Sequence, residues 1–585
     1  MKRFTMTIVV AAIGLLCSFP LAAQGRFAGF VPVTDKMLQF PDPADWLMWR
    51  RTLNSWGYSP LEQITRNNVR QLTLAWSRAM TPGVQEGTPL VYRGVMYMPN
   101  PSDVIQAIDA KTGDLIWQYQ RKWPADLAKY FIIPILATNR NIAIYGNLII
   151  DTSGDDFVFG LDATSGELVW ETKILDYKKG ALQTSGPIIA NGKIISGRGC
   201  EPTGGPEACV ITAHDAKTGT ELWRTRTIPA PGEPGSETWG TVPFEARRHV
   251  GTWMVPSYDA ELNLIYIGTS VTSPAPKFML GGNDKQHLYH NSTLALNATT
   301  GKIVWYYQHL IDHWDMDHPF ERLLVDTKVT PDPRAVLWIN PRLKPGELRK
   351  VITGIPGKTG IVYTLDRQTG EFLWATPTVM QTVITRIDGA TGAVVMNAAM
   401  FFAKVGDERL VCPSGGGGKN WTAGAYSPLT NTMYYPLQNT CMSVTATEPD
   451  SAPLYAIRAR GRIAPNSSNL GTIQAISVET GVITWKDEQR AGTTSLLATG
   501  GGLLFGGDAN GRFRAYDQLT GEVLWEINLG SSVTGYPITY AVGGKQYVAV
   551  STGASPLTGG LLSLTPELRP SSGNNIFVFT LPDRQ

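Results

Sequence analysis

The sequence has almost no excess of either sign of charge. Its 51 lysines and arginines nearly cancel its 49 aspartates and glutamates, which leaves a formal net charge of +2 at pH 7. This balance gives no reason to expect nucleic acid or an acidic surface as a partner. Long apolar runs are also scarce, and the run at Ile8–Cys17 is too short to cross a bilayer. We therefore expect neither nucleic-acid binding nor stable membrane insertion.

Cysteine is scarce, with five residues in the chain. No C-x-x-C-H motif is present, which excludes covalent haem attachment of that type, and no two cysteines have the spacing of a zinc site. Apart from Cys17, the chain has Cys200, Cys209, Cys412 and Cys441. An even number in an exported chain predicts two disulfides. Of the three connectivities, the local pairs Cys200–Cys209 and Cys412–Cys441 are the simplest.

The N-terminus has the pattern of a secretory signal. Two basic residues precede the apolar run, and small residues follow it at Ala22 and Ala23. We predict a signal peptide over residues 1–23, cleaved near Ala23, and a periplasmic location. Cys17 leaves a lipoprotein as an alternative, although Leu16 before it is bulkier than the residue expected at a lipidation site.

Turn-forming and aromatic residues are abundant by contrast. The chain has 60 glycines, 39 prolines, 17 tryptophans and 21 tyrosines, a composition that is typical of strands joined by tight turns. At 585 residues it is too long for one ordinary core, so we expect several domains or one large repetitive architecture.

One phrase, A-x-D-x-x-T-G-x-x-x-W, recurs along the chain. It predicts a hairpin: a strand that ends at the aspartate, a turn whose glycine takes a positive φ, and a second strand that ends in tryptophan. The indole can pack between neighbouring sheets while its N–H finds a carbonyl. Such units must stack on one another to bury both faces. The seven copies are Ala107–Trp117, Gly160–Trp170, Ala213–Trp223, Ala295–Trp305, Thr364–Trp374, Ala475–Trp485 and Ala515–Trp525.

These copies predict an all-β fold, an eight-bladed β-propeller with its loops gathered around a central axis. The eighth sheet is assigned to the degenerate copy Ala425–Pro436 (AYSPLTNTMYYP), which lacks the tryptophan. The segment NNIFVFTL near the C-terminus is expected to be a closing strand. We place a lead-in segment at residues 24–45 and the propeller at residues 46–585.

The segment HLIDHWDMDH, His309–His318, is unlike the rest of the chain. It holds three of the seven histidines and three aspartates. An all-histidine site would suit zinc or copper, whereas carboxylates suit Ca²⁺ or a lanthanide ion. We favour carboxylate chemistry, with the histidines in supporting or structural positions. Asp315 and Asp317 are expected on the same side of an extended strand.

The N-terminal stretch DWLMWRRTLNSWGYSPLEQITRNNVRQLTLAW, the repeats and the HWDMD segment together resemble the quinoprotein alcohol dehydrogenases, periplasmic enzymes that use pyrroloquinoline quinone (PQQ). The resemblance covers essentially the whole mature chain. It implies PQQ on the propeller axis beside a metal ion, Ca²⁺ or a lanthanide. It also implies Asp315 as the catalytic base and Lys358 as the cation that polarises the quinone.

The resemblance extends to further residues, one by one. Those it implies as PQQ contacts are Glu86, Arg140, Ser153, Trp253, Lys358, Asn420 and Trp421. An arginine fork suits the PQQ carboxylates, and an indole suits stacking beneath the ring system. The metal ligands it implies are Asp315, Asp317 and a glutamate, for which Glu201 and Glu207 both stay open.

The chain also departs from the family pattern. Val271 takes the place of an asparagine metal ligand, and Pro134 and Ile135 take the place of two adjacent cysteines that cap the quinone. Thr493 replaces a tryptophan near the substrate. Loss of the tryptophan and of the cap predicts a roomier mouth than a methanol-sized cavity.

The resulting hypothesis is a periplasmic PQQ- and metal-dependent dehydrogenase that oxidises an alcohol by hydride transfer to PQQ. Because the sequence has no haem motif, electrons are expected to pass to an external acceptor such as a c-type cytochrome. The alternative is a non-catalytic eight-bladed scaffold of the bacterial envelope. Convergence of the site residues on one axial pocket would favour the enzyme. The identity of the alcohol stays open, as does assembly as a monomer or homo-oligomer.

Overall fold

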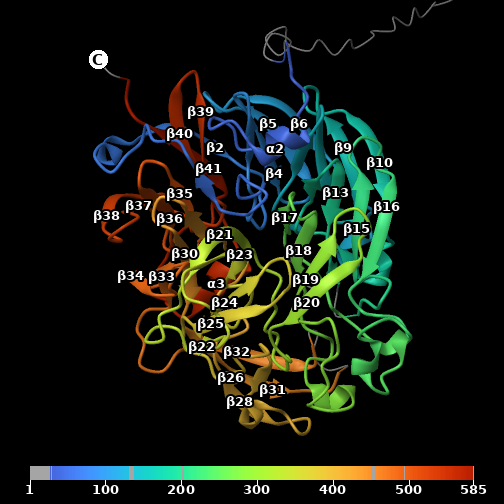
Figure 1. The fold of residues 1–585 in the computed structure, drawn as a ribbon. Coiled ribbons are helices and arrows are strands. Elements are labelled where there is room, and N and C mark those ends of the chain that lie inside the picture. Colours follow the sequence, from blue (N-terminus) through green and yellow to red (C-terminus); the bar gives the residue numbers. More distant parts are fainter. Residues whose placement is uncertain are drawn as a thin grey trace, which may run out of the picture.

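The computed structural model describes residues 27, 29–130, 137–200, 203–449, 455–492 and 494–583. Eight sheets of four or five strands form the framework of this part of the chain. They follow one another in sequence order and surround a common axis, so the predicted all-β, eight-bladed propeller is confirmed (Figure 1). In most blades the first strand is buried and the last is largely exposed, which places the first strand near the axis.

The first four blades each have four antiparallel strands. They are β3 (Leu90–Tyr92), β4 (Val95–Asn100), β5 (Val104–Asp109) and β6 (Leu115–Gln120); β7 (Ala143–Tyr145), β8 (Leu148–Thr152), β9 (Phe157–Asp162) and β10 (Leu168–Lys173); β12 (Ile188–Ala190), β13 (Lys193–Ser196), β15 (Val210–Asp215) and β16 (Glu221–Arg226); and β17 (Ser257–Asp259), β18 (Leu264–Gly268), β19 (Ser292–Asn297) and β20 (Ile303–Gln308).

The remaining four blades contain two five-stranded sheets. They are β21 (Leu323–Val329), β23 (Glu347–Gly354), β24 (Ile361–Asp366), β25 (Phe372–Pro377) and β22 (Trp338–Ile339); β29 (Ala425–Ser427), β30 (Thr432–Gln438), β33 (Gly471–Ser477) and β34 (Ile483–Gln489); β1 (Tyr58–Ser59), β35 (Leu497–Thr499), β36 (Leu503–Gly507), β37 (Arg512–Asp517) and β38 (Val523–Asn528); and β39 (Ile538–Val542), β40 (Lys545–Thr552), β41 (Asn575–Thr580) and β2 (Thr73–Ala79).

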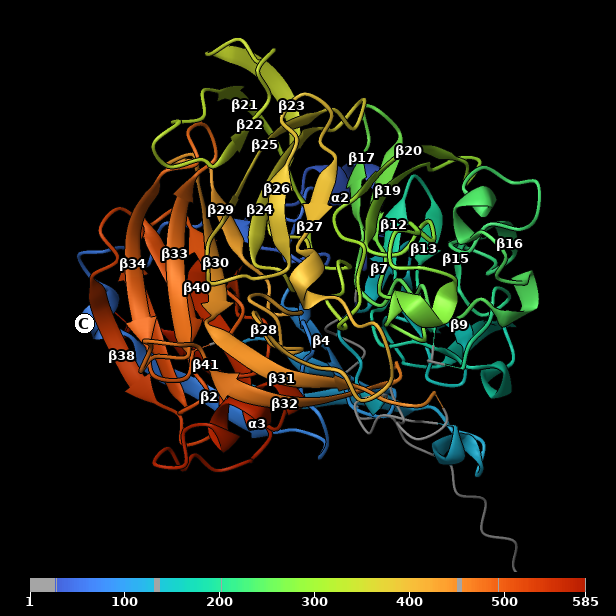
Figure 2. The same ribbon diagram turned by 90° about the horizontal axis from the view of Figure 1, so that it is seen from below.

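Smaller elements lie outside the blades. A three-stranded sheet, β28–β31–β32, lies beside the helix α3 (Figure 2). The strands of these smaller sheets are β11 (Ala181–Leu182), β14 (Gly199–Cys200), β26 (Ile384–Ile387), β27 (Val394–Met396), β28 (Glu408–Val411), β31 (Thr440–Ala446) and β32 (Ile457–Ile463). The helices are α2 (Asp35–Gln39), α3 (Pro556–Ser563) and the 3₁₀ turns η1 (Val69–Gln71), η2 (Leu127–Lys129), η4 (Tyr177–Lys179), η5 (Ser236–Trp239), η6 (Phe244–Ala246), η7 (Lys277–Leu280) and η8 (Ala398–Met400).

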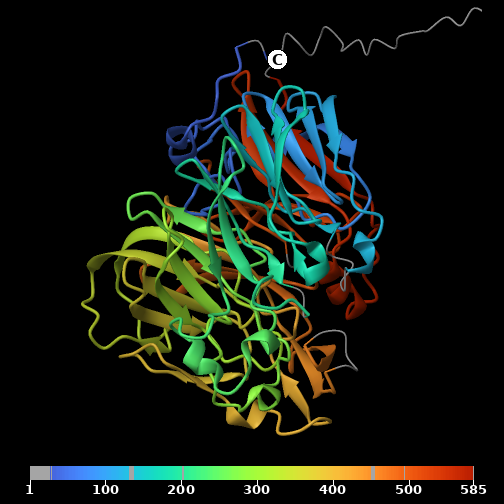
Figure 3. The same cartoon turned by 90° about the vertical axis from the view of Figure 1, so that its right-hand side faces the viewer.

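The eighth blade is not formed by the segment to which we assigned it. Residues 425–436 supply β29 and most of β30, which join the same sheet as the repeat Ala475–Trp485. The eighth sheet instead joins the two ends of the chain, because β2 pairs antiparallel with the C-terminal strand β41. This pairing places the blue N-terminal and red C-terminal sheets side by side (Figure 3). The closing strand predicted near the C-terminus is thereby confirmed.

The repeats pack between blades as their sequence predicts. Trp117 stacks on Gly166 of the next repeat, where a Cβ would stand 2.6 Å from the ring. Its indole N–H donates to the Ala163 carbonyl at 3.1 Å. Gly166 has a φ of +75°, a backbone conformation that residues with a side chain rarely adopt. One detail was wrong: the second strand does not end at the tryptophan, since β6 continues to Gln120 and keeps pairing with β5.

Both predicted disulfides are present, Cys200–Cys209 and Cys412–Cys441. The first starts from the last residue of β14, and the second joins the residue after β28 to β31. The predicted signal peptide, residues 1–23, lies outside the described residues, and the lead-in segment contributes α2. Where the chain is described, it contains no helix long and apolar enough to span a bilayer.

Candidate active site at the propeller axis

The loops that carry the predicted site residues share one position in the blades. Glu86 precedes β3, Arg140 precedes β7, Trp253 precedes β17 and Trp421 precedes β29. Because each loop leads into the first strand of a blade, these side chains approach the axis from the same end of the propeller. The repeat architecture therefore brings together residues that are hundreds of positions apart.

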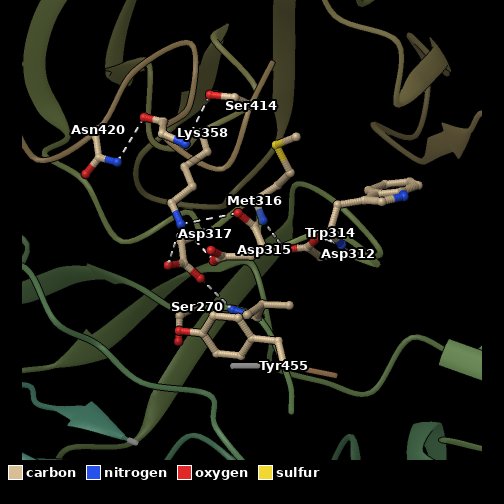
Figure 4. A network of polar contacts seen from close by, with 12 residues as sticks. Ser270, Asp312, Trp314, Asp315, Met316, Asp317, Lys358, Ser414, Asn420 and Tyr455 are labelled. Atoms are coloured by element: carbon tan, nitrogen blue, oxygen red, sulfur yellow. Dashed lines mark hydrogen bonds and ion pairs between the residues drawn. The ribbon is translucent and has the colours of Figure 1, made fainter. Parts of the chain in front are cut away.

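At the centre lies a lysine between two carboxylates (Figure 4). Lys358, in the connection between β23 and β24, lies 2.7 Å from Asp315 Oδ1 and 3.2 Å from Asp317 Oδ2. Its backbone N–H also donates to the Asp317 carbonyl at 2.8 Å. Our expectation of an extended strand for Asp315 and Asp317 was wrong, because the segment is a loop in which Asp315 has a φ of +66°. The two carboxylates converge because they share Lys358.

The two aspartates differ in their partners. Asp317 accepts from the Val271 backbone N–H at 2.8 Å and from the Trp253 indole at 3.2 Å, in addition to Lys358. Burial acts to raise the pKa of Asp317, but the charge of Lys358, the His249 ring and the Val271 N–H hold it below its ordinary value. Burial raises the pKa of Asp315 well above its ordinary value, and Lys358 opposes this only in part. Of the pair, Asp315 is the carboxylate that more readily holds a proton.

Asp312 holds the shape of the loop that carries Asp315. Its carboxylate accepts from the backbone N–H groups of Trp314 at 2.7 Å and Met316 at 2.5 Å. Asn291 donates to the same carboxylate at 3.0 Å and to the Met316 carbonyl at 2.9 Å. These bonds fix the backbone on both sides of Asp315, so its unusual φ is supported by its neighbours.

The histidines of this segment lie in the packing of the loop. His309 bonds to the Thr293 hydroxyl at 2.7 Å and stacks on His318, while His313 stacks on Phe401 at 4.3 Å between ring centroids. Burial lowers the pKa of all three. Among the described residues, no group of three or more histidines, cysteines, aspartates or glutamates is placed to hold a metal ion.

A buried arginine supports the aromatic side of the site. Arg140 lies 2.6 Å from Glu86, and the Arg140 and Glu86 side chains are 1% and 0% exposed. Its guanidinium lies 5.3 Å from the ring centroid of Trp253 and 6.0 Å from that of Trp421. Since the Trp253 indole also bonds to Asp317, the contacts run without a break from Glu86 to Lys358. Asn420 is bonded to the Gly416 carbonyl at 2.9 Å.

Other predicted residues are not brought to this network. Ser153 donates to Asp155 and accepts from the Phe157 N–H, so its hydroxyl serves its own turn. Glu207 is 61% exposed and pairs with Arg226 at 3.2 Å, away from Asp315. Glu201, Pro134, Ile135 and Thr493 lie outside the described residues.

The structure adds residues that we did not single out. Ser555 donates to Glu86 at 2.7 Å, and Arg140 donates to the Thr184 carbonyl at 3.2 Å. His249 bonds to the carbonyl of Val271 at 2.7 Å, directly behind the N–H that holds Asp317. Thr184 lies in the stretch QTSGP, directly before β12, the first strand of its blade. This position, which the other axial residues share, could have identified Thr184 from the sequence. His249 and Ser555 gave no comparable signal, because only folding brings them near the axis.

Unpaired polar atoms test whether the network fits a planar, carboxylated cofactor. Within the described part of the chain, buried atoms without a partner include Arg140 Nε, Trp421 Nε1, Ser185 Oγ and both side-chain polar atoms of Gln85. Buried polar groups normally find partners, so such a concentration beside a guanidinium and two indoles fits a polar aromatic ligand. PQQ, with its fused rings and carboxylates, has this chemistry. The metal is only partly matched: Asp315 and Asp317 offer oxygen donors, and of the two glutamates expected as the third ligand, Glu207 pairs with Arg226 and Glu201 lies outside the described residues.

Comparison with known proteins places the chain among redox enzymes. A sequence model described as the glucose/ethanol/alcohol dehydrogenase β-propeller domain of the PQQ family matches residues 46–393 and 453–548. The quinohemoprotein alcohol dehydrogenase ADH-IIG of Pseudomonas putida is 32% identical over 574 residues, covering 90% of this chain and 75% of that protein. The quinoprotein alcohol dehydrogenase PedH of Pseudomonas putida is 30% identical, covering 90% of this chain and 89% of that protein.

Solved structures agree. ADHIIG from Pseudomonas putida HK5 superposes with a TM-score of 0.81 at 30% identity, covering 95% of this chain and 83% of that one. A europium-containing methanol dehydrogenase superposes with a TM-score of 0.83 at 26% identity, covering 94% of this chain and all of the other. The family match covers the loops that carry Glu86, Arg140, Trp253, Asp315 and Lys358, and these relatives extend over 90% or more of the chain. The chain belongs to the PQQ-dependent alcohol dehydrogenase family of eight-bladed β-propeller oxidoreductases.

Proposed function

We propose that this protein oxidises an alcohol to an aldehyde or ketone at the propeller axis, with Asp315 as the base that takes the hydroxyl proton. The observation that carries the proposal is the contact of Lys358 with Asp315 and Asp317 beside the Arg140–Trp253 pair. PQQ, when bound, would accept the hydride that leaves the alcohol carbon.

The roles of the residues follow from their contacts. Asp315 is bound to Lys358 through Oδ1, so its other oxygen stays available to accept a proton from a bound alcohol. Lys358 supplies a positive charge beside that proton transfer and would also lie against the quinone oxygens. Asp317, held by the N–H groups of Val271 and Trp253, keeps Lys358 in place.

The cofactor would be held by Arg140 and Glu86, by the indoles of Trp253 and Trp421, and by Asn420. The unpaired groups of Gln85 and Ser185 would supply further hydrogen bonds. Asp315 and Asp317 would give oxygen ligands to Ca²⁺ or a lanthanide ion, with Glu201 as the third.

We place the enzyme in the periplasm, after removal of the signal peptide at residues 1–23. Two electrons must leave the site after each turnover. The sequence has no C-x-x-C-H motif, so we propose a separate electron acceptor such as a c-type cytochrome.

The test is reconstitution of metal-free protein with PQQ and either Ca²⁺ or La³⁺, followed by dye reduction over a panel of alcohols. We expect turnover that requires PQQ and is lost in Asp315→Ala. The better metal would define the role of Asp317. If PQQ fails to bind with either metal, the proposal is wrong and the protein is a scaffold.

A further inference from the structure

A cavity of about 350 Å³ lies beside the catalytic loop. One wall is the hairpin β31–β32, which contributes Met442, Ala459 and Gly461, and the opposite wall is α3, with Leu557 and Leu561. Figure 2 shows β31, β32 and α3 close together on one face of the propeller. The volume is within the range of pockets that hold drug-sized ligands, far above what methanol needs.

Gly415 connects this cavity to the catalytic base. It lines the cavity, and a Cβ on Gly415 would stand 3.8 Å from Asp315 Oδ2 and 3.8 Å from Met442 Sδ. The next glycine, Gly416, comes as close to Leu557, at 3.7 Å from its Cδ1. Because glycine has no side chain, nothing from these two positions separates Asp315 from the apolar walls.

Most polar side chains that line the cavity are paired, and the exception is the Trp421 indole, whose Nε1 has no partner among the described residues. The hydroxyls of Ser414 and Thr440 bond to each other at 2.7 Å. Asn420 donates to the Gly416 carbonyl at 2.9 Å and accepts from the Trp421 N–H at 2.8 Å. With these groups satisfied, the cavity offers a ligand mainly hydrocarbon surface from methionine, leucine and alanine. A polyol would lose hydrogen bonds to water on entering it.

The cavity is built mostly by segments that lie outside the family match. Residues 394–452 and those after 548 are not covered by it. The first segment supplies Gly415 and Met442 and the second supplies α3, whereas Asp315 and Lys358 lie inside the match. The matched segments thus contribute Asp315 and Lys358, and the unmatched segments contribute most of the lining of the cavity.

We infer that this cavity binds the hydrocarbon tail of the alcohol, and that the natural substrate is a large, largely apolar alcohol. The inference rests on the proposed function, because it takes Asp315 as the point where the hydroxyl group lies. Met442, Leu557 and Leu561 supply the apolar contacts, and the small residues Ala459 and Gly461 keep the space open.

Strand β32 offers a matched test of this role. Ala459 and Gly461 face the cavity, while Arg458, Arg460 and Arg462 alternate with them on the opposite side of the strand. A leucine at position 459 or a valine at position 461 would therefore fill the cavity. The control Arg460→Leu adds a similar side chain to the outer face. All three positions are exposed strand positions, where folding should tolerate the change.

The first experiment measures kcat/KM of the PQQ-loaded enzyme for ethanol, 1-butanol, 1-hexanol, 1-octanol and glycerol. Burial of each methylene should raise kcat/KM by about fourfold until the cavity is full. Ala459→Leu and Gly461→Val should lower the ratio of octanol to ethanol activity at least tenfold, and Arg460→Leu should leave it unchanged. A kcat/KM that does not change with the chain length of the alcohol, or one that is highest for glycerol, would overturn the inference.

The second experiment separates this inference from the proposed function. Isothermal titration calorimetry of the same proteins with 1-octanol needs no turnover. Binding to the wild type and to Arg460→Leu, weakened at least tenfold in the filled variants, would support the tail site even if no alcohol were oxidised. Equal binding to all variants, or none to the wild type, would rule the site out. Absence of turnover with every alcohol would count against the proposed function alone.

Discussion

Lys358 holds Asp315 through one carboxylate oxygen and leaves the other beside Gly415. The ammonium lies 2.7 Å from Oδ1, whereas Oδ2 lies 3.8 Å from where a Cβ on Gly415 would stand. The carboxylate is thus oriented by an ion pair at one end and adjoins open space at the other. This division suits a base, since orientation and proton acceptance use different oxygens.

Replacing Asp315 by asparagine should remove the base and keep the shape. The amide oxygen of the new side chain would still accept a hydrogen bond from Lys358, so the loop should persist. We expect kcat to fall about 10²–10⁴-fold, the usual contribution of a general base. PQQ affinity, measured by fluorescence titration, should stay within a few-fold of wild type. Asp284→Asn, at a side chain that is 77% exposed, is the control and should change neither value. Full activity in Asp315→Asn would contradict the assignment.

A second buried ion pair should matter for stability. Lys419 lies 2.6 Å from Glu321, both side chains are 0% exposed, and the second Glu321 oxygen accepts from the Gly424 N–H. Removing one partner leaves an unpaired buried charge, so Glu321→Gln or Lys419→Met should each cost about 3–5 kcal/mol in the free energy of unfolding.

The double variant Glu321→Leu/Lys419→Met supplies the control for that pair. It removes both charges, so it should be less destabilised than the sum of the two single variants. Urea unfolding followed by tryptophan fluorescence measures the three values. Additive losses would show that the two charges do not stabilise each other.

The fold could be predicted from sequence because the repeat is local. Each hairpin, from its aspartate to its tryptophan, lies within eleven residues, as in Ala107–Trp117, and the glycine that receives the indole of the preceding repeat lies in the same phrase. The eighth blade was assigned to the wrong segment because its sheet combines strands from the two ends of the chain. Trp76 of β2 packs on Gly113 as the other tryptophans do, but the strand that pairs with β2 is β41, some 500 residues later.

The site could be predicted only in part, for the same reason. Arg140, Trp253 and Lys358 were found through resemblance to a family, and the structure brings them together with Asp315 and Asp317. Residue periodicity misplaced the aspartates, because the geometry of the loop depends on Asp312 and Asn291, not on a strand. The departures from the family pattern predicted a roomier mouth, but the lining of the cavity could not be predicted, since α3 and the β31–β32 hairpin meet only in the folded chain.

The inter-blade glycines should resist substitution. Gly166→Ala would force a side chain into a φ of +75° and to within 2.6 Å of the Trp117 ring. The left-handed conformation costs about 1–2 kcal/mol, and overpacking adds about 1–3 kcal/mol. Gly559→Ala in α3 is the counterpart, since a Cβ there meets nothing within 4 Å, and it should stabilise the protein by about 0.5–1 kcal/mol. The melting temperature should therefore fall for Gly166→Ala and rise slightly for Gly559→Ala.

Acid should destabilise the protein through its histidines, and His214 isolates the effect. His214 is fully buried at the repeat position where Ile108 and Leu161 stand in other blades, and its ring nitrogens have no hydrogen-bond partner among the described residues. Burial lowers its pKa to about 4, below the value of 6.5 that it has when unfolded. The unfolded chain therefore takes up the proton first. The contribution of His214 to the free energy of unfolding is therefore fully present above pH 6.5 and is lost as the pH falls toward 4.

His214→Leu restores the residue type that the other repeats use and removes this titration. The decline of the melting temperature between pH 7 and pH 4.5 should be shallower in His214→Leu than in the wild type, with the largest difference at pH 4.5. Some decline should remain, because burial also lowers the pKa of His287 and His318, each to about 3. Parallel curves for the two proteins would mean that His214 already carries its proton in the folded state, which its burial and the nearby Arg198 guanidinium oppose.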